Sequence, residues 1–79
     1  MVFNKLVKTD ELQIGGRAYP VRYFESQTAS GNLRYSSELL LGPADLIIFD
    51  GNSVTALEWK VARLVPATIY SRELAARAA

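Results

Sequence analysis

Residues 12–19 read Leu-Gln-Ile-Gly-Gly-Arg-Ala-Tyr, and this stretch decides how the first half of the chain folds. The pair Gly15-Gly16 can adopt the positive φ angles of a two-residue hairpin turn without steric cost. A turn of that length also fixes the register of the two strands that it joins. The predicted cross-strand pairs are Ile14 with Arg17, Leu12 with Tyr19, Asp10 with Val21, Lys8 with Tyr23 and Leu6 with Glu25. These residues share one mainly apolar face, and the residues between them form a mainly polar face.

A third strand is predicted at Leu33 to Leu39, after a polar loop from Ser26 to Asn32. Its apolar residues alternate with polar ones, which is typical of a strand with one buried face. Pairing Tyr23 with Tyr35 continues the apolar face across three strands. Aromatic sheet faces can stack the bases of single-stranded nucleic acid. Because leucine, isoleucine and valine share this face, including Leu33, we interpret its tyrosines as core residues that a helix covers.

Two more elements follow. The continuous apolar run Leu46 to Phe49 predicts a short strand buried on both faces, which could pair at either edge of the sheet. Asn52 or Ser53 then caps a helix, because the next residues carry an apolar stripe at helical spacing. The stripe consists of Val54, Leu57, Val61, Leu64 and Val65. The step Val65-Pro66 should end or kink this helix and leave a second helical segment from Ala67 to Ala79.

The predicted fold is therefore α+β: a small antiparallel sheet of three to four strands, in the order β-β-β-(β)-α, with a C-terminal helix packed on one face. We expect a single domain spanning residues 1–79. A chain of this length is near the lower limit for a self-sufficient hydrophobic core, and it has no cysteine for a disulfide. A homodimer is one way to add buried area.

Histidine and cysteine are both absent, which excludes most familiar catalytic designs. A histidine base, a Ser-His or Cys-His pair, and the usual zinc, haem and iron–sulfur sites all need these residues. The sequence Asp50-Gly51-Asn52-Ser53 lacks the ligand series of an EF-hand and is interpreted as a turn with a helix cap. We expect no enzyme, no cofactor and no metal site. An enzyme that uses carboxylates or tyrosine remains an alternative, and it would need a pocket between subunits.

The formal net charge of +1 creates no field that would attract nucleic acid or an anionic membrane. The first residues, Met1 to Leu6, form no signal peptide, and no apolar run is long enough to span a bilayer. The expected location is the cytoplasm, with which the lack of cysteine agrees.

Trp59 is the most informative candidate for function. It points away from the apolar stripe of its own helix, so the surface that buries the stripe cannot bury Trp59 as well. Its cover is the segment after Pro66 folding back, a second copy of the chain, or a partner protein. Tryptophan is enriched at interaction hot spots, and Arg63 is placed to stack on the indole. The candidate interaction surface comprises Trp59, Lys60, Arg63 and Tyr70.

Three segments together resemble the small antitoxin domains of the HicB type. They are Tyr19 to Glu25, Leu33 to Leu39, and the Asp50-Gly51-Asn52-Ser53 turn into the helix. The resemblance implies a partner protein and operator DNA as ligands. We therefore keep an antitoxin-like or nucleic-acid-binding regulator as the alternative function. Its candidate contacts are Lys60, Arg63, Arg72 and Arg77, although the charge balance disfavours nucleic acid.

Overall fold

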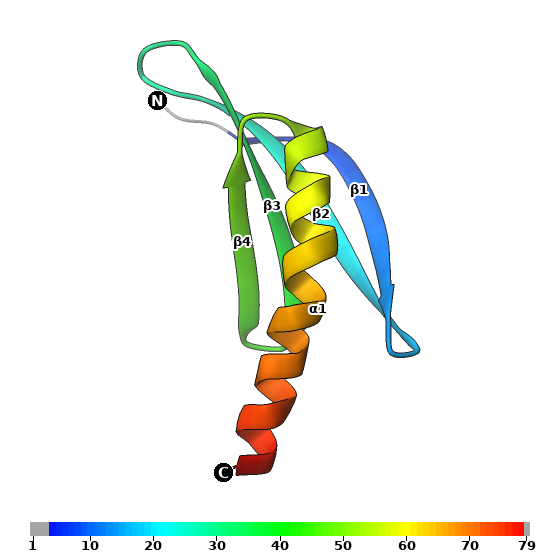
Figure 1. Ribbon diagram of the computed structural model, residues 1–79. Coiled ribbons are helices and arrows are strands. Elements are labelled where there is room, and N and C mark those ends of the chain that lie inside the picture. The colour runs from blue at the N-terminus through cyan, green and yellow to red at the C-terminus, as the bar shows by residue number, and fades with distance from the viewer. Residues whose placement is uncertain (1–3, 79) are drawn as a thin grey trace.

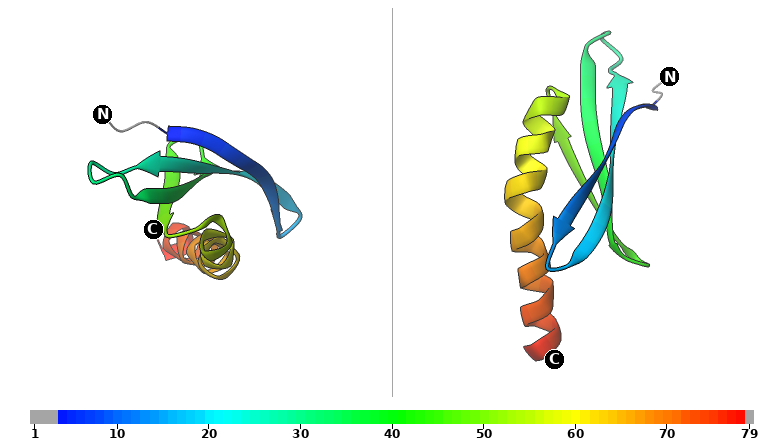
Figure 2. Two further views of the ribbon diagram at one scale, coloured as in Figure 1. Left: turned by 90° about the horizontal axis from the view of Figure 1, so that it is seen from above. Right: turned by 90° about the vertical axis from the view of Figure 1, so that its right-hand side faces the viewer.

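The protein, seen here as a computed structural model, is described for residues 4–78. Four strands precede one helix: β1 (Asn4–Ile14), β2 (Arg17–Gln27), β3 (Leu33–Gly42), β4 (Asp45–Gly51) and α1 (Val54–Ala78). The strands form one antiparallel sheet in the order β1-β2-β3-β4, and α1 covers one of its faces (Figures 1 and 2). The predicted α+β class is confirmed, and the fourth strand lies at the edge next to β3. Residues 1–3 and 79 lie outside the described part. The predicted end of the second helical segment, at Ala79, is therefore outside the described residues.

The first hairpin has the predicted turn and most of the predicted register. Gly15 and Gly16 have φ angles of 58° and 77°, as a type I′ turn requires. Pairing follows the prediction from Ile14 as far as Lys8. There a β-bulge inserts Val7, and Leu6 pairs with Phe24 instead of Glu25. The prediction for Leu6 is wrong because a bulge adds a residue to one strand and reverses the face of those beyond it.

The predicted register between β2 and β3 is wrong by two residues. Tyr23 lies opposite Ser37, and Tyr35 lies opposite Glu25. The connecting loop sets this register: the Thr28 amide donates to the Asn32 carbonyl at 2.8 Å. A slip of two residues leaves every side chain on its predicted face, because side chains alternate with period two.

The core lies between α1 and the face of the sheet that carries the tyrosines. Its buried side chains are Tyr19, Val21, Tyr23, Leu39, Leu57, Val61 and Val65. The interpretation of Tyr19 and Tyr23 as core residues is therefore confirmed. The Ser37 hydroxyl is buried with them and finds no hydrogen-bond partner among the described residues. Such a hydroxyl costs about 1–3 kcal/mol of stability. Leu33 and Leu64, both predicted to be core residues, are 52% and 45% exposed.

Strand β4 is buried on one face only. Ile47 and Phe49 are half-buried on the helix side, whereas Leu46 and Ile48 are 48% and 56% exposed on the other. The prediction of a strand covered on both faces is wrong. The described chain supplies one helix, which covers one face of the sheet.

Helix α1 is continuous through Pro66, so the predicted break there is wrong. The ring removes one amide donor, the one that would reach the carbonyl of Ala62. Both residues are exposed, so water can hydrogen-bond to that carbonyl. At the start of the helix, the Ser53 hydroxyl accepts a hydrogen bond from the Ala56 amide at 3.1 Å, which confirms Ser53 as the N-cap.

Within residues 4–78, no helix combines the length and the apolar character that crossing a membrane requires.

Gly51 is predicted to be intolerant of a side chain. A Cβ at this position would lie 3.1 Å from two carbons of Leu57, which is fully buried. Gly51→Ala should therefore lower the free energy of unfolding by about 1–3 kcal/mol, measured by urea denaturation. Gly42→Ala is the matched control, because its nearest contact would lie at 4.0 Å. Equal stability of the two variants would contradict the close approach of α1 to β4.

Pro66→Ala should stabilise the protein. Alanine restores the amide donor for the Ala62 carbonyl, and a helix-interior proline costs about 3 kcal/mol, of which about 1 kcal/mol is offset by the stiffer unfolded chain. The expected gain in the free energy of unfolding is about 2 kcal/mol, measured by urea denaturation. A loss of stability would show that α1 depends on its proline.

Candidate interaction surface

The face of α1 that points away from the sheet carries large side chains with high exposure. We define the outer helix face as Trp59, Arg63, Tyr70 and Leu74, with Leu64 at its margin, next to the buried side of the helix. Trp59 is 68% exposed, Tyr70 is 61% exposed, and the two leucines are each 45% exposed. Since α1 continues past Pro66, the chain that follows cannot fold back over the indole. Of the three predicted ways in which Trp59 could be covered, folding back of the segment after Pro66 is therefore ruled out.

Shallow depressions lie on both sides of the Trp59 ring. Lys60, Arg63 and Leu64 line one of them with Trp59, and Glu58 and Ala62 line the other. The predicted stacking of Arg63 on the indole does not occur: the cation–π contacts in the described part of the chain join other pairs, such as Arg17 with Tyr19. Both sides of the indole are thus open to a ligand.

Two polar contacts fix the rotation of α1 about its axis. On one side, the Lys60 ammonium donates to the Asp50 carbonyl of β4 at 2.6 Å. On the other side, Lys8 of β1 forms an ion pair with Glu58 at 2.7 Å. The Glu58 carboxylate raises the pKa of Lys8 by accepting this hydrogen bond. Lys60 therefore anchors the helix to the sheet, and together the two contacts keep Trp59 turned outward.

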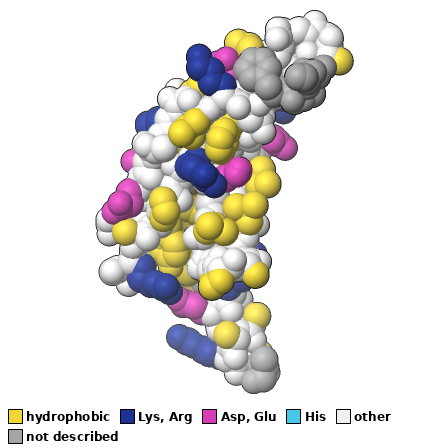
Figure 3. Space-filling view, turned by 180° about the vertical axis from the view of Figure 1, so that it is seen from behind, with side chains coloured by type: hydrophobic (Ala, Val, Ile, Leu, Met, Phe, Trp, Pro, Cys, Tyr) yellow, Lys and Arg dark blue, Asp and Glu magenta, His cyan; other side chains and the backbone are white. Residues whose placement is uncertain are grey.

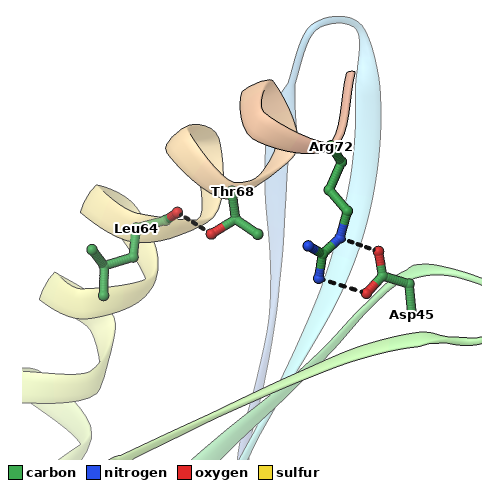
Figure 4. A network of polar contacts seen from close by, with 4 residues as sticks. All are labelled: Asp45, Leu64, Thr68 and Arg72. Carbon is green, nitrogen blue, oxygen red and sulfur yellow. Dashed lines mark hydrogen bonds and ion pairs between the residues drawn. The ribbon is translucent and has the colours of Figure 1, made fainter. Parts of the chain in front are cut away.

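A third contact holds the part of α1 beyond Pro66. The Arg72 guanidinium reaches both carboxylate oxygens of Asp45, with Nη2 at 2.8 Å from Oδ1 (Figure 4). In the same view, the Thr68 hydroxyl donates to the Leu64 carbonyl at 2.8 Å. The guanidinium lowers the pKa of Asp45, and the carboxylate raises the pKa of Arg72. This bidentate pair ties the helix to the start of β4.

The four basic residues considered for nucleic acid do not gather on one surface. Lys60 is held by the Asp50 carbonyl, and Arg72 is held by the Asp45 carboxylate. Arg63 lies on the outer helix face beside Trp59. Two of the four side chains, Lys60 and Arg72, are thus already engaged within the chain.

The sheet carries a second apolar surface that the sequence reasoning missed. The face opposite α1 shows hydrophobic side chains around a central charged pair (Figure 3). Arg22 and Glu38 lie opposite each other on β2 and β3, and their charged atoms are 3.9 Å apart. The exposed apolar residues of this face include Leu6, Pro20, Leu40, Leu46 and Ile48. The signal that could have revealed it was the presence of a single helix, which leaves one sheet face bare.

The pair Asp45–Arg72 should make stability fall in acid. The folded-state pKa of Asp45 lies below the ordinary value of 3.8, so its contribution is complete above that value and is lost as pH falls through the lower folded-state pKa. In a carboxyl carbon-13 titration, Arg72→Gln should return the Asp45 midpoint toward 3.8. Lys60→Gln, which touches no atom of Asp45, is the control. If the Asp45 midpoint in Arg72→Gln stays at its wild-type value, Arg72 is not the cause of the lowered pKa of Asp45.

Comparison of the chain with protein-family models, with curated proteins and with solved structures returned no match. The resemblance to HicB-type antitoxins accordingly stays a prediction.

Proposed function

We propose that this protein is a non-enzymatic interaction module that binds an apolar, carboxylate-bearing segment of a partner protein through the outer helix face. The observation that carries the proposal is the 68% exposure of Trp59 in a chain with only one tryptophan. The lack of histidine and cysteine supports a role without catalysis. We also propose a cytoplasmic location, which agrees with the lack of cysteine.

The composition of the face supports binding. Tryptophan, tyrosine and arginine are the residue types enriched at hot spots of protein interfaces, and leucine adds apolar area around them. Trp59 and Arg63 line the same depression, so one ligand side chain can touch both. Covering the indole removes apolar surface from water. This stabilises the complex in proportion to the apolar area that is covered.

The charge of the face argues for a foreign partner instead of a second copy. Arg63 is the charged residue of the outer helix face, and Glu58, the acidic residue beside Trp59, is already paired with Lys8. A two-fold contact whose axis passes close to Arg63 would bring two guanidinium groups together in a partly desolvated site, where like charges repel. A partner segment with an aspartate or glutamate pairs with Arg63 instead and covers the indole with its apolar side chains.

Truncating the face should leave the fold unchanged. Trp59→Ala and Arg63→Ala are expected to alter the free energy of unfolding by no more than about 0.5 kcal/mol, because neither side chain belongs to the core. Leu57→Ala is the contrasting control and should cost about 2–5 kcal/mol, since Leu57 is fully buried. If Trp59→Ala unfolds the protein, Trp59 is structural and the proposal fails.

The binding test uses Trp59 as its own probe. A protein retained by the wild-type chain is purified and titrated back while the indole emission is recorded. The proposal expects a blue shift, and it expects Trp59→Ala and Arg63→Glu to lose affinity while Lys5→Glu, a charge reversal on β1, retains it. Three results would overturn the proposal: an unchanged emission, equal binding by all variants, or emission that shifts with the protein's own concentration. Steeply salt-dependent binding of nucleic acid that Arg63→Ala abolishes would favour the alternative regulator instead.

A further inference from the structure

Strand β4 has an unpaired edge. The sheet order places β1 and β4 at the two edges, and β4 pairs with β3 alone among the described residues. Figure 1 shows β4 at the outside of the sheet. Backbone N–H and C=O groups along such an edge are a template for another strand.

The two edges of the sheet differ in how they are protected. The β1 edge carries the bulge at Val7 and the charged side chains of Lys5 and Lys8, devices that discourage pairing with another chain. The interior of β4, Leu46 to Phe49, contains no charged residue and no proline, and the irregularity in its pairing lies on β3 between Leu40 and Gly42. The centre of β4 therefore lacks the features that protect the β1 edge, whereas at the end of β4 the Asp50 carbonyl already accepts a hydrogen bond from Lys60.

The side chains of β4 also leave apolar area uncovered. Leu46 and Ile48 are about half exposed on the sheet face opposite α1, at 48% and 56%. Ile47 and Phe49 are half-buried on the helix side. A strand added at this edge would cover both sets and would satisfy the free backbone groups.

We propose that β4 pairs antiparallel with β4 of a second copy of this chain, about a two-fold axis at Ile48, to form one eight-stranded sheet. Ile48 is the midpoint of Asp45–Gly51, so pairing centred there engages the whole strand. Asp45 then faces Gly51, Leu46 faces Asp50, Ile47 faces Phe49, and Ile48 faces Ile48.

The partner strand is assigned to a second copy of the chain because β4 is complementary to itself in this register. No two carboxylates face each other in this register, and Asp45 is already paired with Arg72 within its own chain. Apolar side chains meet at the centre on both faces, as an isologous contact requires. Directly opposed residues in an antiparallel pair share a face. Both copies of α1 therefore lie on the same side of the joined sheet, and Leu46 and Ile48 of the two copies form one apolar strip on the other side.

This dimer is distinct from the proposed function, because it is built on β4 and not on the outer helix face. It presents two copies of Trp59 on one side of the assembly, so the dimer can bind a partner with two sites. The two inferences are separated by experiment: the dimer depends on Ile48, and partner binding depends on Trp59.

The first test is the solution mass, measured by light scattering over a concentration series. The wild-type chain should have twice the mass of one chain, and Ile48→Lys, which places two ammonium groups opposite each other, should have half the wild-type mass. Leu33→Lys is the matched control, since Leu33 is 52% exposed on β3 away from the edge, and it should stay dimeric. Circular dichroism confirms that each variant is folded. A wild-type monomer at every concentration would overturn the dimer.

The second test fixes the register. The chain has no cysteine, so a single introduced thiol reports one position. Residues directly opposed across an antiparallel pair have Cβ atoms about 4.5–5.5 Å apart, close enough for small shifts to allow a disulfide. Ile48→Cys should give a disulfide-linked dimer on mild oxidation, whereas Leu33→Cys should not. A dimer that survives Ile48→Lys and is lost in Trp59→Ala would place the contact on the outer helix face and refute the β4 pairing.

Discussion

One helix must cover a four-stranded sheet, and the approach of α1 to the end of β4 makes that cover possible. Leu57 is fully buried at this point, and a Cβ at Gly51 would make tight contacts of 3.1 Å with it. From there, Val61 and Val65 continue the buried line of the helix along the tyrosine face. Because Leu57, Val61 and Val65 face the core, the opposite side of α1, including Trp59, faces solvent. The single helix also leaves the far face of the sheet without a layer.

Short segments of the sequence were enough to predict the first hairpin and the buried side of α1. The Gly15-Gly16 pair sets both the turn and the adjoining register, because positive φ at two successive residues leaves few other geometries. The Ser53 cap and the spacing of Leu57, Val61 and Val65 set the start and the buried side of α1. The outward direction of Trp59 follows from the same helical spacing and could be derived without a structure.

The missed features depend on contacts that a periodic pattern does not encode. The bulge at Val7 changes the pairing of Leu6 without leaving a composition signal. The loop before β3 shifts its register through hydrogen bonds within the loop. Pro66 stays inside α1 because its ring is on an exposed side and the Arg72–Asp45 pair holds the following turns. The role of Lys60 as an anchor was missed for the same reason: its partner is a backbone carbonyl ten residues earlier.

The order of the elements along the chain has a consequence for how the protein is made. Each strand pairs with the strand just before it, so the sheet can assemble through short-range contacts, which favours rapid folding. The helix that buries Tyr19, Val21 and Tyr23 comes last. During synthesis the hairpin therefore leaves the ribosome with its apolar face open, and it stays open until α1 has emerged. In that interval the apolar face of the hairpin is exposed to water and to contact with other chains.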